Sequence, residues 1–138
     1  MSPDAEISYH ADCVEIIMSQ FAPDFTVIGF HLGEGDPEQG GQHWNFTQSV
    51  PPEEGDFAGV CTVKEIQQVT VYGGIRRFHI WPDHLVCEFD ERTAPATGAC
   101  RLRGSHTISP EKWEELSQMA ERIFEGHAGF QTGRPDEP

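Results

Sequence analysis

The first 63 residues contain no lysine and no arginine, although they include 11 aspartates and glutamates. The whole chain of 138 residues has 9 basic and 23 acidic side chains, a net charge of −14. A charge this negative argues against direct binding to nucleic acid or to an anionic membrane. It indicates a soluble protein, or one whose partner is basic.

The chain also lacks long apolar runs. No stretch of about 18 apolar residues occurs, so no transmembrane helix is expected. Residues 1–6 have neither the basic nor the apolar region of a signal peptide. The sequence therefore predicts a cytoplasmic protein with reduced thiols. Its four cysteines form no CxxC pair and are expected to be small buried residues; they are Cys13, Cys61, Cys87 and Cys100.

Recognisable catalytic motifs are missing as well. The sequence has no GxSxG, no P-loop and no GxGxxG, and its seven histidines are scattered. His79 and His84 flank the turn at Trp81-Pro82-Asp83, and Glu88 follows. Together they offer a metal-ligand set, so a small metal-dependent enzyme is the alternative hypothesis. The other interpretation is that these histidines are ordinary polar residues of a turn and of a strand surface, with no catalytic or metal-binding role.

What the sequence does contain is a series of strand patterns followed by one clear helix. Runs rich in β-branched and aromatic residues, bounded by Gly and Pro, predict strands. These runs are 25–32, 43–50, 59–63 with 66–72 (bent near residues 64–65), 76–81, 85–89 and 100–108. Residues 6–18 fit neither period cleanly; a strand is favoured, with a helix as the alternative. Gly73-Gly74 predicts a type I′ hairpin turn.

The helix is expected over residues 110–125. Ser109 suits the N-cap, Pro110 the first turn and Gly126 the C-terminal stop. Trp113, Phe124 and the apolar residues between them recur at helical spacing. Strands followed by a helix predict an α+β fold, mainly antiparallel, with the helix packed on one face of the sheet. We expect one domain over residues 1–126, a polar loop over 90–99 and a flexible polar tail over 127–138.

From Tyr72-Gly73-Gly74-Ile75 onward the chain resembles the immunity protein 10 family of bacterial polymorphic toxin systems. The similarity covers residues 69–80, in which a Tyr/Phe-Gly-Gly-Ile segment opens a strand, then the strand at 85–89 and a closing segment from residue 106 that contains the helix. Segments 27–30 and 43–48 also lie where that family has strands. The resemblance implies a cytoplasmic immunity protein that binds a cognate toxin domain, with no catalytic residues and no cofactor.

The acidic first half fits such a role if the toxin is basic, as a nuclease with a basic cleft would be. Exposed charges are screened beyond about 8–10 Å, so only clustered acids act together. Two Gly- or Pro-rich segments contain such clusters and are predicted to be loops. The candidate toxin-binding residues are Glu34, Asp36, Glu38, Glu53, Glu54 and Asp56. No metal, nucleic acid or membrane is expected as a partner.

Overall fold

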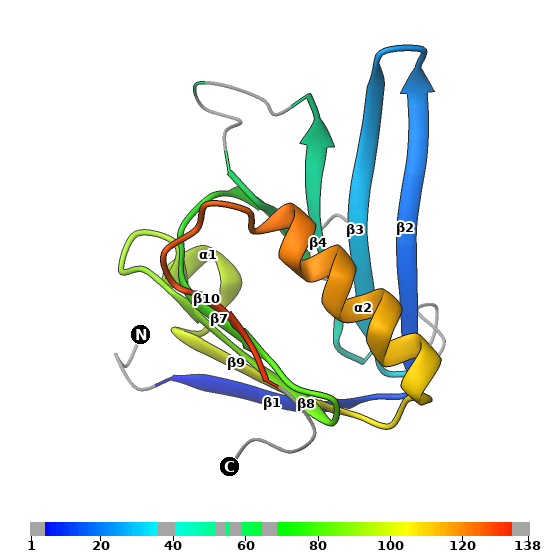
Figure 1. Ribbon diagram of the computed structural model, residues 1–138. Helices are drawn as coiled ribbons and strands as arrows, with labels where there is room; N and C mark the ends of the chain where they lie inside the picture. Colours follow the sequence, from blue (N-terminus) through cyan, green and yellow to red (C-terminus); the bar gives the residue numbers. More distant parts are fainter. Residues whose placement is uncertain (1–4, 36–40, 52–54, 56–58, 65–68, 134–138) are drawn as a thin grey trace.

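The computed structural model describes residues 5–133 except 36–40, 52–54, 56–58 and 65–68. These described residues form two five-stranded sheets and two helices (Figure 1). Sheet A has the order β1 (Glu6–Ala11), β9 (Arg101–His106), β8 (His84–Phe89), β7 (Ile75–Ile80) and β10 (Phe130–Thr132). Sheet B has the order β2 (Cys13–Ala22), β3 (Phe25–Gly33), β4 (His43–Val50), β5 (Cys61–Lys64) and β6 (Val69–Tyr72). The helices are α1 (Ala94–Thr97) and α2 (Pro110–Ile123).

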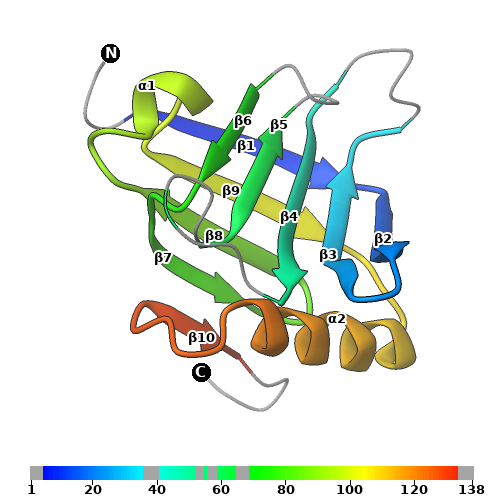
Figure 2. The ribbon, with the colours of Figure 1, turned by 90° about the horizontal axis from the view of Figure 1, so that it is seen from above.

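The predicted α+β class, mainly antiparallel with a C-terminal helix, is confirmed. Sheet B is antiparallel throughout, and sheet A is parallel only where β1 pairs with β9 and β10 with β7. Helix α2 lies along one side of the two sheets (Figure 2). Neither described helix is long and apolar enough to cross a membrane.

The hydrophobic core lies between the sheets and α2, and its centre is Phe78 of β7. Phe30 and Phe46 of sheet B approach this ring, with centroids 6.0 and 5.1 Å away. Phe124, just after α2, stacks on it at 4.5 Å. All four side chains are at most 2% exposed. A single aromatic cluster thus joins both sheets to the helix.

Helix α2 begins as the sequence predicts and ends two residues earlier. Ser109 Oγ accepts a hydrogen bond of 3.1 Å from the backbone N–H of Lys112, which satisfies one of the free donors of the first turn. The buried side of the helix consists of Leu116, Met119, Ala120 and Ile123. Trp113, expected to be a main anchor, is only partly buried at the margin of the core.

The hairpin predicted at Gly73-Gly74 is wrong, although both residues do have positive φ, +70° and +81°. β6 belongs to sheet B and β7 to sheet A, so the two glycines carry the chain around a corner between sheets. A Cβ on Gly74 would lie 1.9 Å from Thr93 Oγ1. Only glycine meets both demands, a left-handed backbone and a close neighbour.

The strand favoured for residues 6–18 is confirmed, but it is two strands. Asp12 separates β1 of sheet A from β2 of sheet B. A single residue thus makes the second corner between the sheets.

The prediction of a loose tail over residues 127–138 is wrong for Phe130–Thr132, which forms β10 beside β7. The Phe130 ring stacks on Phe124 at 5.0 Å between centroids. Residues 134–138 lie outside the described part of the chain. The expected loop at 90–99 contains the single turn of α1.

Candidate functional site

Only one of the six candidate toxin-binding acids, Glu34, lies among the described residues. Its Oε1 accepts a hydrogen bond of 2.9 Å from the backbone N–H of Gln42, and its own N–H donates to the carbonyl of Gln42 at 2.8 Å. Glu34 therefore closes the base of the loop between β3 and β4. Asp36, Glu38, Glu53, Glu54 and Asp56 lie outside the described residues.

The two acidic loops leave β4 at opposite ends. One precedes His43 and the other follows Val50. Eight residues of strand span about 23 Å, more than twice the distance over which exposed charges interact at physiological salt. The points at which the two acidic segments join β4 are thus farther apart than this screening distance.

Two histidines and an asparagine occupy the outer face of sheet B beside the first loop. His31 Nδ1 lies 2.5 Å from Asn45 Oδ1, and His43 Nδ1 lies 3.3 Å from His31 Nε2. Because an amide oxygen only accepts, His31 Nδ1 is the donor to Asn45. A Cβ on Gly33 would come within 2.2 Å of His43 Nδ1. Gly33 therefore gives the two rings the space in which they stack.

His79, His84 and Glu88 share the outer face of sheet A, but they do not form a metal site. The Trp81 ring lies between the two histidines, with ring centroids 3.5 and 4.2 Å away. His84 Nδ1 pairs with Asp83 Oδ1 at 2.7 Å. Glu88 is held instead by two arginines of β7. Among the described residues, no three His, Cys, Asp or Glu side chains are grouped so that they could hold a metal ion.

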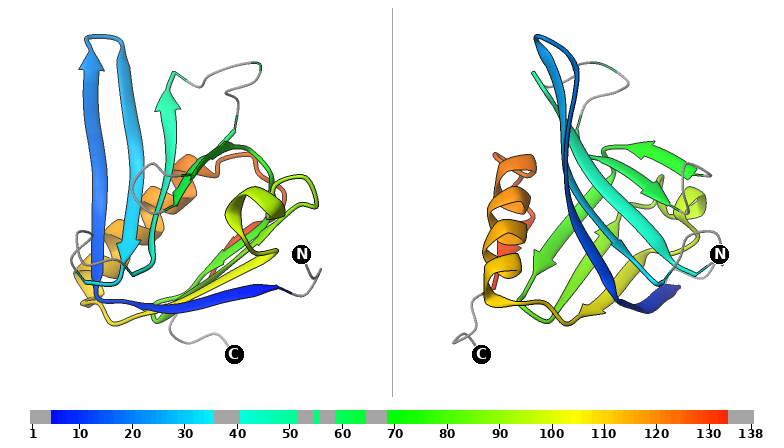
Figure 3. Two further views of the ribbon diagram at one scale, coloured as in Figure 1. Left: turned by 180° about the vertical axis from the view of Figure 1, so that it is seen from behind. Right: turned by 90° about the vertical axis from the view of Figure 1, so that its right-hand side faces the viewer.

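Among the described residues, the large apolar side chains that are exposed to solvent all belong to sheet B. Met18 and Phe21 of β2 are 63% and 71% exposed, and Val50 and Tyr72, at the ends of β4 and β6, are 39% and 44% exposed. The β2–β3 hairpin projects farther than the other described strands (Figure 3). Clustered exposed apolar groups are typical of protein-binding surfaces, whereas isolated ones are ordinary.

A pocket of about 400 Å³ lies on the outer face of the same sheet. Its walls come from four neighbouring strands: Phe25 and Val27, Thr47 and Ser49, Cys61, and Tyr72. Burial raises the pKa of the Cys61 thiol, although hydrogen bonds with Thr47 and Tyr72 oppose this. The pocket is therefore lined by apolar groups and uncharged polar groups. We call it, with Phe21 and the hairpin turn at Asp24, the hairpin-end surface.

Sequence reasoning did not find the hairpin-end surface, although one signal was available. Ile16, Ile17 and Met18 are consecutive apolar residues in a strand, so both faces of that strand are apolar. One face of β2 packs on the core through Val14 and Ile16. The other face, with Ile17 and Phe21, must then meet solvent or a partner.

Comparison of the chain with known protein families, characterised proteins and solved structures yields no match.

Proposed function

We propose that the chain is an immunity protein that binds a cognate bacterial toxin domain and blocks it by forming a stoichiometric complex. The sequence resemblance around Tyr72-Gly73-Gly74-Ile75 and the closing helix suggests this class. The observation that carries the proposal is the hairpin-end surface. Its exposed aromatic side chains beside a pocket are the usual anchors of a protein interface.

The partner we infer is basic. Asp24 stands in the turn between β2 and β3, and the loop with Glu53, Glu54 and Asp56 starts where β4 ends, close to the pocket. No lysine or arginine occurs in residues 1–63. An acidic margin around apolar anchors favours a partner with the opposite arrangement, and complementary charge accelerates association.

This arrangement changes which acids are expected to matter. Glu34 accepts from the backbone N–H of Gln42, and the segment that contains Asp36 and Glu38 joins β4 at His43, the opposite end of that strand from the pocket residue Ser49. We therefore assign the main electrostatic contribution to Glu53, Glu54 and Asp56.

The first test is whether a protein with a toxin-like C-terminal domain is encoded directly upstream of this chain; the second measures association with that domain. Reversing Glu53, Glu54 and Asp56 to Lys should slow association about tenfold at low salt and flatten its salt dependence. The matched control reverses Glu114 and Glu121 of α2 and Glu125 just after it, all of which are exposed, and so makes the same change in net charge. Reversing Asp36 and Glu38 to Lys measures, for comparison, how much the other acidic segment contributes to the association rate.

The apolar anchors are tested by dissociation. Phe21→Ala and Tyr72→Ala should each speed dissociation at least about tenfold, because truncating a central aromatic side chain typically costs about 2 kcal/mol or more. Val86→Ala on sheet A is the control. Equal effects of the α2 reversal and the loop reversal would refute the location of the site. Failure of the wild-type chain to bind or to protect cells from the toxin domain would refute the function.

A further inference from the structure

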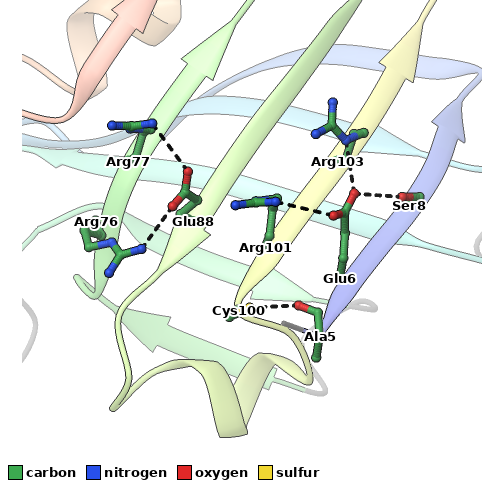
Figure 4. Close-up of polar contacts among 9 residues, drawn as sticks. All are labelled: Ala5, Glu6, Ser8, Arg76, Arg77, Glu88, Cys100, Arg101 and Arg103. Atoms are coloured by element: carbon green, nitrogen blue, oxygen red, sulfur yellow. Dashed lines mark hydrogen bonds and ion pairs between the residues drawn. The ribbon is translucent and has the colours of Figure 1, made fainter. Parts of the chain in front are cut away.

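The outer face of sheet A carries a cluster of positive charge on this acidic protein. Four of the chain's nine basic side chains project from it: Arg76, Arg77, Arg101 and Arg103 (Figure 4). We call these residues the arginine face. With Glu6 and Glu88, the ionised groups that pair with them, the net formal charge is 4 − 2 = +2, against −14 for the whole chain.

The strand register aligns these groups across the sheet. Arg77 of β7 is opposite Glu88 of β8, Glu88 is opposite Arg101 of β9, and Arg101 is opposite Glu6 of β1. Each glutamate contacts two arginines. Arg76 Nη2 donates to Glu88 Oε1 and Arg103 Nε to Glu6 Oε1, both at 3.0 Å, while Arg77 and Arg101 approach the other carboxylate oxygens at 3.7 Å.

The two signs of charge lie at different depths. The side chains of Glu88 and Glu6 are 13% and 32% exposed, whereas those of Arg76 and Arg77 are 68% and 66% exposed. Arg101 and Arg103 are 44% and 49% exposed. The carboxylates therefore orient the guanidinium groups from below, and an approaching molecule meets the guanidinium groups first. Each guanidinium keeps several N–H donors beyond the one its glutamate accepts.

We propose that the arginine face binds an extended acidic segment of a partner protein, with carboxylates at alternate positions. Arg101 and Arg103 are two residues apart on one strand, so their Cα atoms are separated by about 6.7 Å. The same spacing separates the carboxylates of alternate residues in an extended peptide. Arg77 lies two strands away, at about 9.6 Å, and so can receive a third carboxylate from the same segment or its neighbour.

The charge of the rest of the molecule favours this occupant over a long polyanion. A nucleic acid or an anionic membrane extends well beyond the face and meets a chain whose net charge is −14. A short peptide segment contacts the arginines alone. The site is distinct from the hairpin-end surface, because it is on the other sheet and selects the opposite charge.

The probe is a fluorescein-labelled peptide of alternating Glu and Thr, seven residues long, titrated with the full chain at low salt and followed by fluorescence anisotropy. Binding should weaken as salt rises. The double variant R101Q/R103Q should lose about tenfold in affinity, since two exposed charge contacts are removed. The matched control R92Q/R122Q removes two exposed arginines from elsewhere on the chain and should change affinity less than about twofold.

Three outcomes would overturn the proposal. Equal losses in the two double variants would mean that the peptide responds only to net charge. Equal or tighter binding of a labelled single-stranded oligonucleotide of the same charge would make the face a general polyanion site. Sedimentation that shows a dimer in the wild type and a monomer in R101Q/R103Q would make a second copy of the chain the occupant. Circular dichroism checks that both double variants keep the fold, and the single variant R77Q provides a test outside β9.

Discussion

Truncating Phe124 should destabilise the protein much more than truncating Trp113. Phe124 is 2% exposed, and its ring stacks on Phe78 at 4.5 Å and on Phe130 at 5.0 Å. Replacing a buried Phe by Ala typically costs about 3–5 kcal/mol, and stacked aromatic pairs put this site in the upper half of that range. Trp113 is only partly buried, so its removal should cost about 2 kcal/mol.

These costs convert into measurable shifts in melting temperature. Unfolding entropy is about 2.1 cal/mol/K per residue, or about 290 cal/mol/K for 138 residues. A loss of about 4 kcal/mol in Phe124→Ala therefore lowers Tm by about 14 °C, and a loss of about 2 kcal/mol in Trp113→Ala lowers it by about 7 °C. Calorimetry measures both, with urea denaturation as an independent determination.

The exposed ring of Phe21 provides the control, because 71% of it is already in solvent. Phe21→Ala should leave Tm within about 2 °C of the wild type. A Trp113 variant that is as unstable as the Phe124 variant would refute the packing described for α2. It would mean that the helix is held by its first turn and not by the aromatic cluster at its end.

Three further predictions concern single residues. Gly74→Val should lower the free energy of unfolding by at least about 2 kcal/mol in urea denaturation, because φ is positive and Thr93 fills the space beside the Cα; an unchanged midpoint would contradict the corner geometry. The hydrogen bond from Arg103 holds the pKa of Glu6 in the folded protein below its usual value. The ionised carboxylate therefore stabilises the fold at any pH above the pKa that Glu6 has in the unfolded chain. This stabilisation is lost as the pH falls through the lower pKa of the folded protein. Glu6→Gln should therefore reduce stability at about pH 7 but not at about pH 2, and equal losses at both would refute the pairing. Burial raises the pKa of the Cys87 thiol well above its usual value, so it should react with Ellman's reagent only after denaturation; a reaction at the rate of the other cysteines would contradict its burial.

The local signals in the sequence predict local structure well. The N-cap of α2 depends on Ser109 and the residues just after it, and the structure contains the expected hydrogen bond to Lys112. The positive φ of Gly73 and Gly74 also follows from residue type alone. What residue type does not specify is the sheet to which the next strand belongs. The hairpin prediction failed because an alternating strand can be buried equally well in either sheet.

Pairing between distant segments explains the other differences. β10 is only three residues long and is stabilised by its place beside β7 and by the ring of Phe130. No pattern in so short a segment predicts this. The proposed metal-ligand set is not brought together for a similar reason: the sequence places His79 and His84 at one turn, but only the structure shows that the Trp81 ring lies between them. For the candidate site, the sequence alone revealed the surplus of acids. The apolar surface could be located only once the structure showed which side chains of the strands are exposed.

The parallel pairing of β1 with β9 determines the order in which the two sheets can be completed. Sheet B consists of five consecutive strands, each paired with the next along the chain, so it needs only short loops to close. β1 must wait for a strand about 95 residues later, as the contact between His10 and Ser105 shows. Closing long loops is slow and entropically costly. During synthesis β1 therefore emerges before β9 but can pair with it only after β9 has left the ribosome, and α2, which packs on β2 and β3, follows later still.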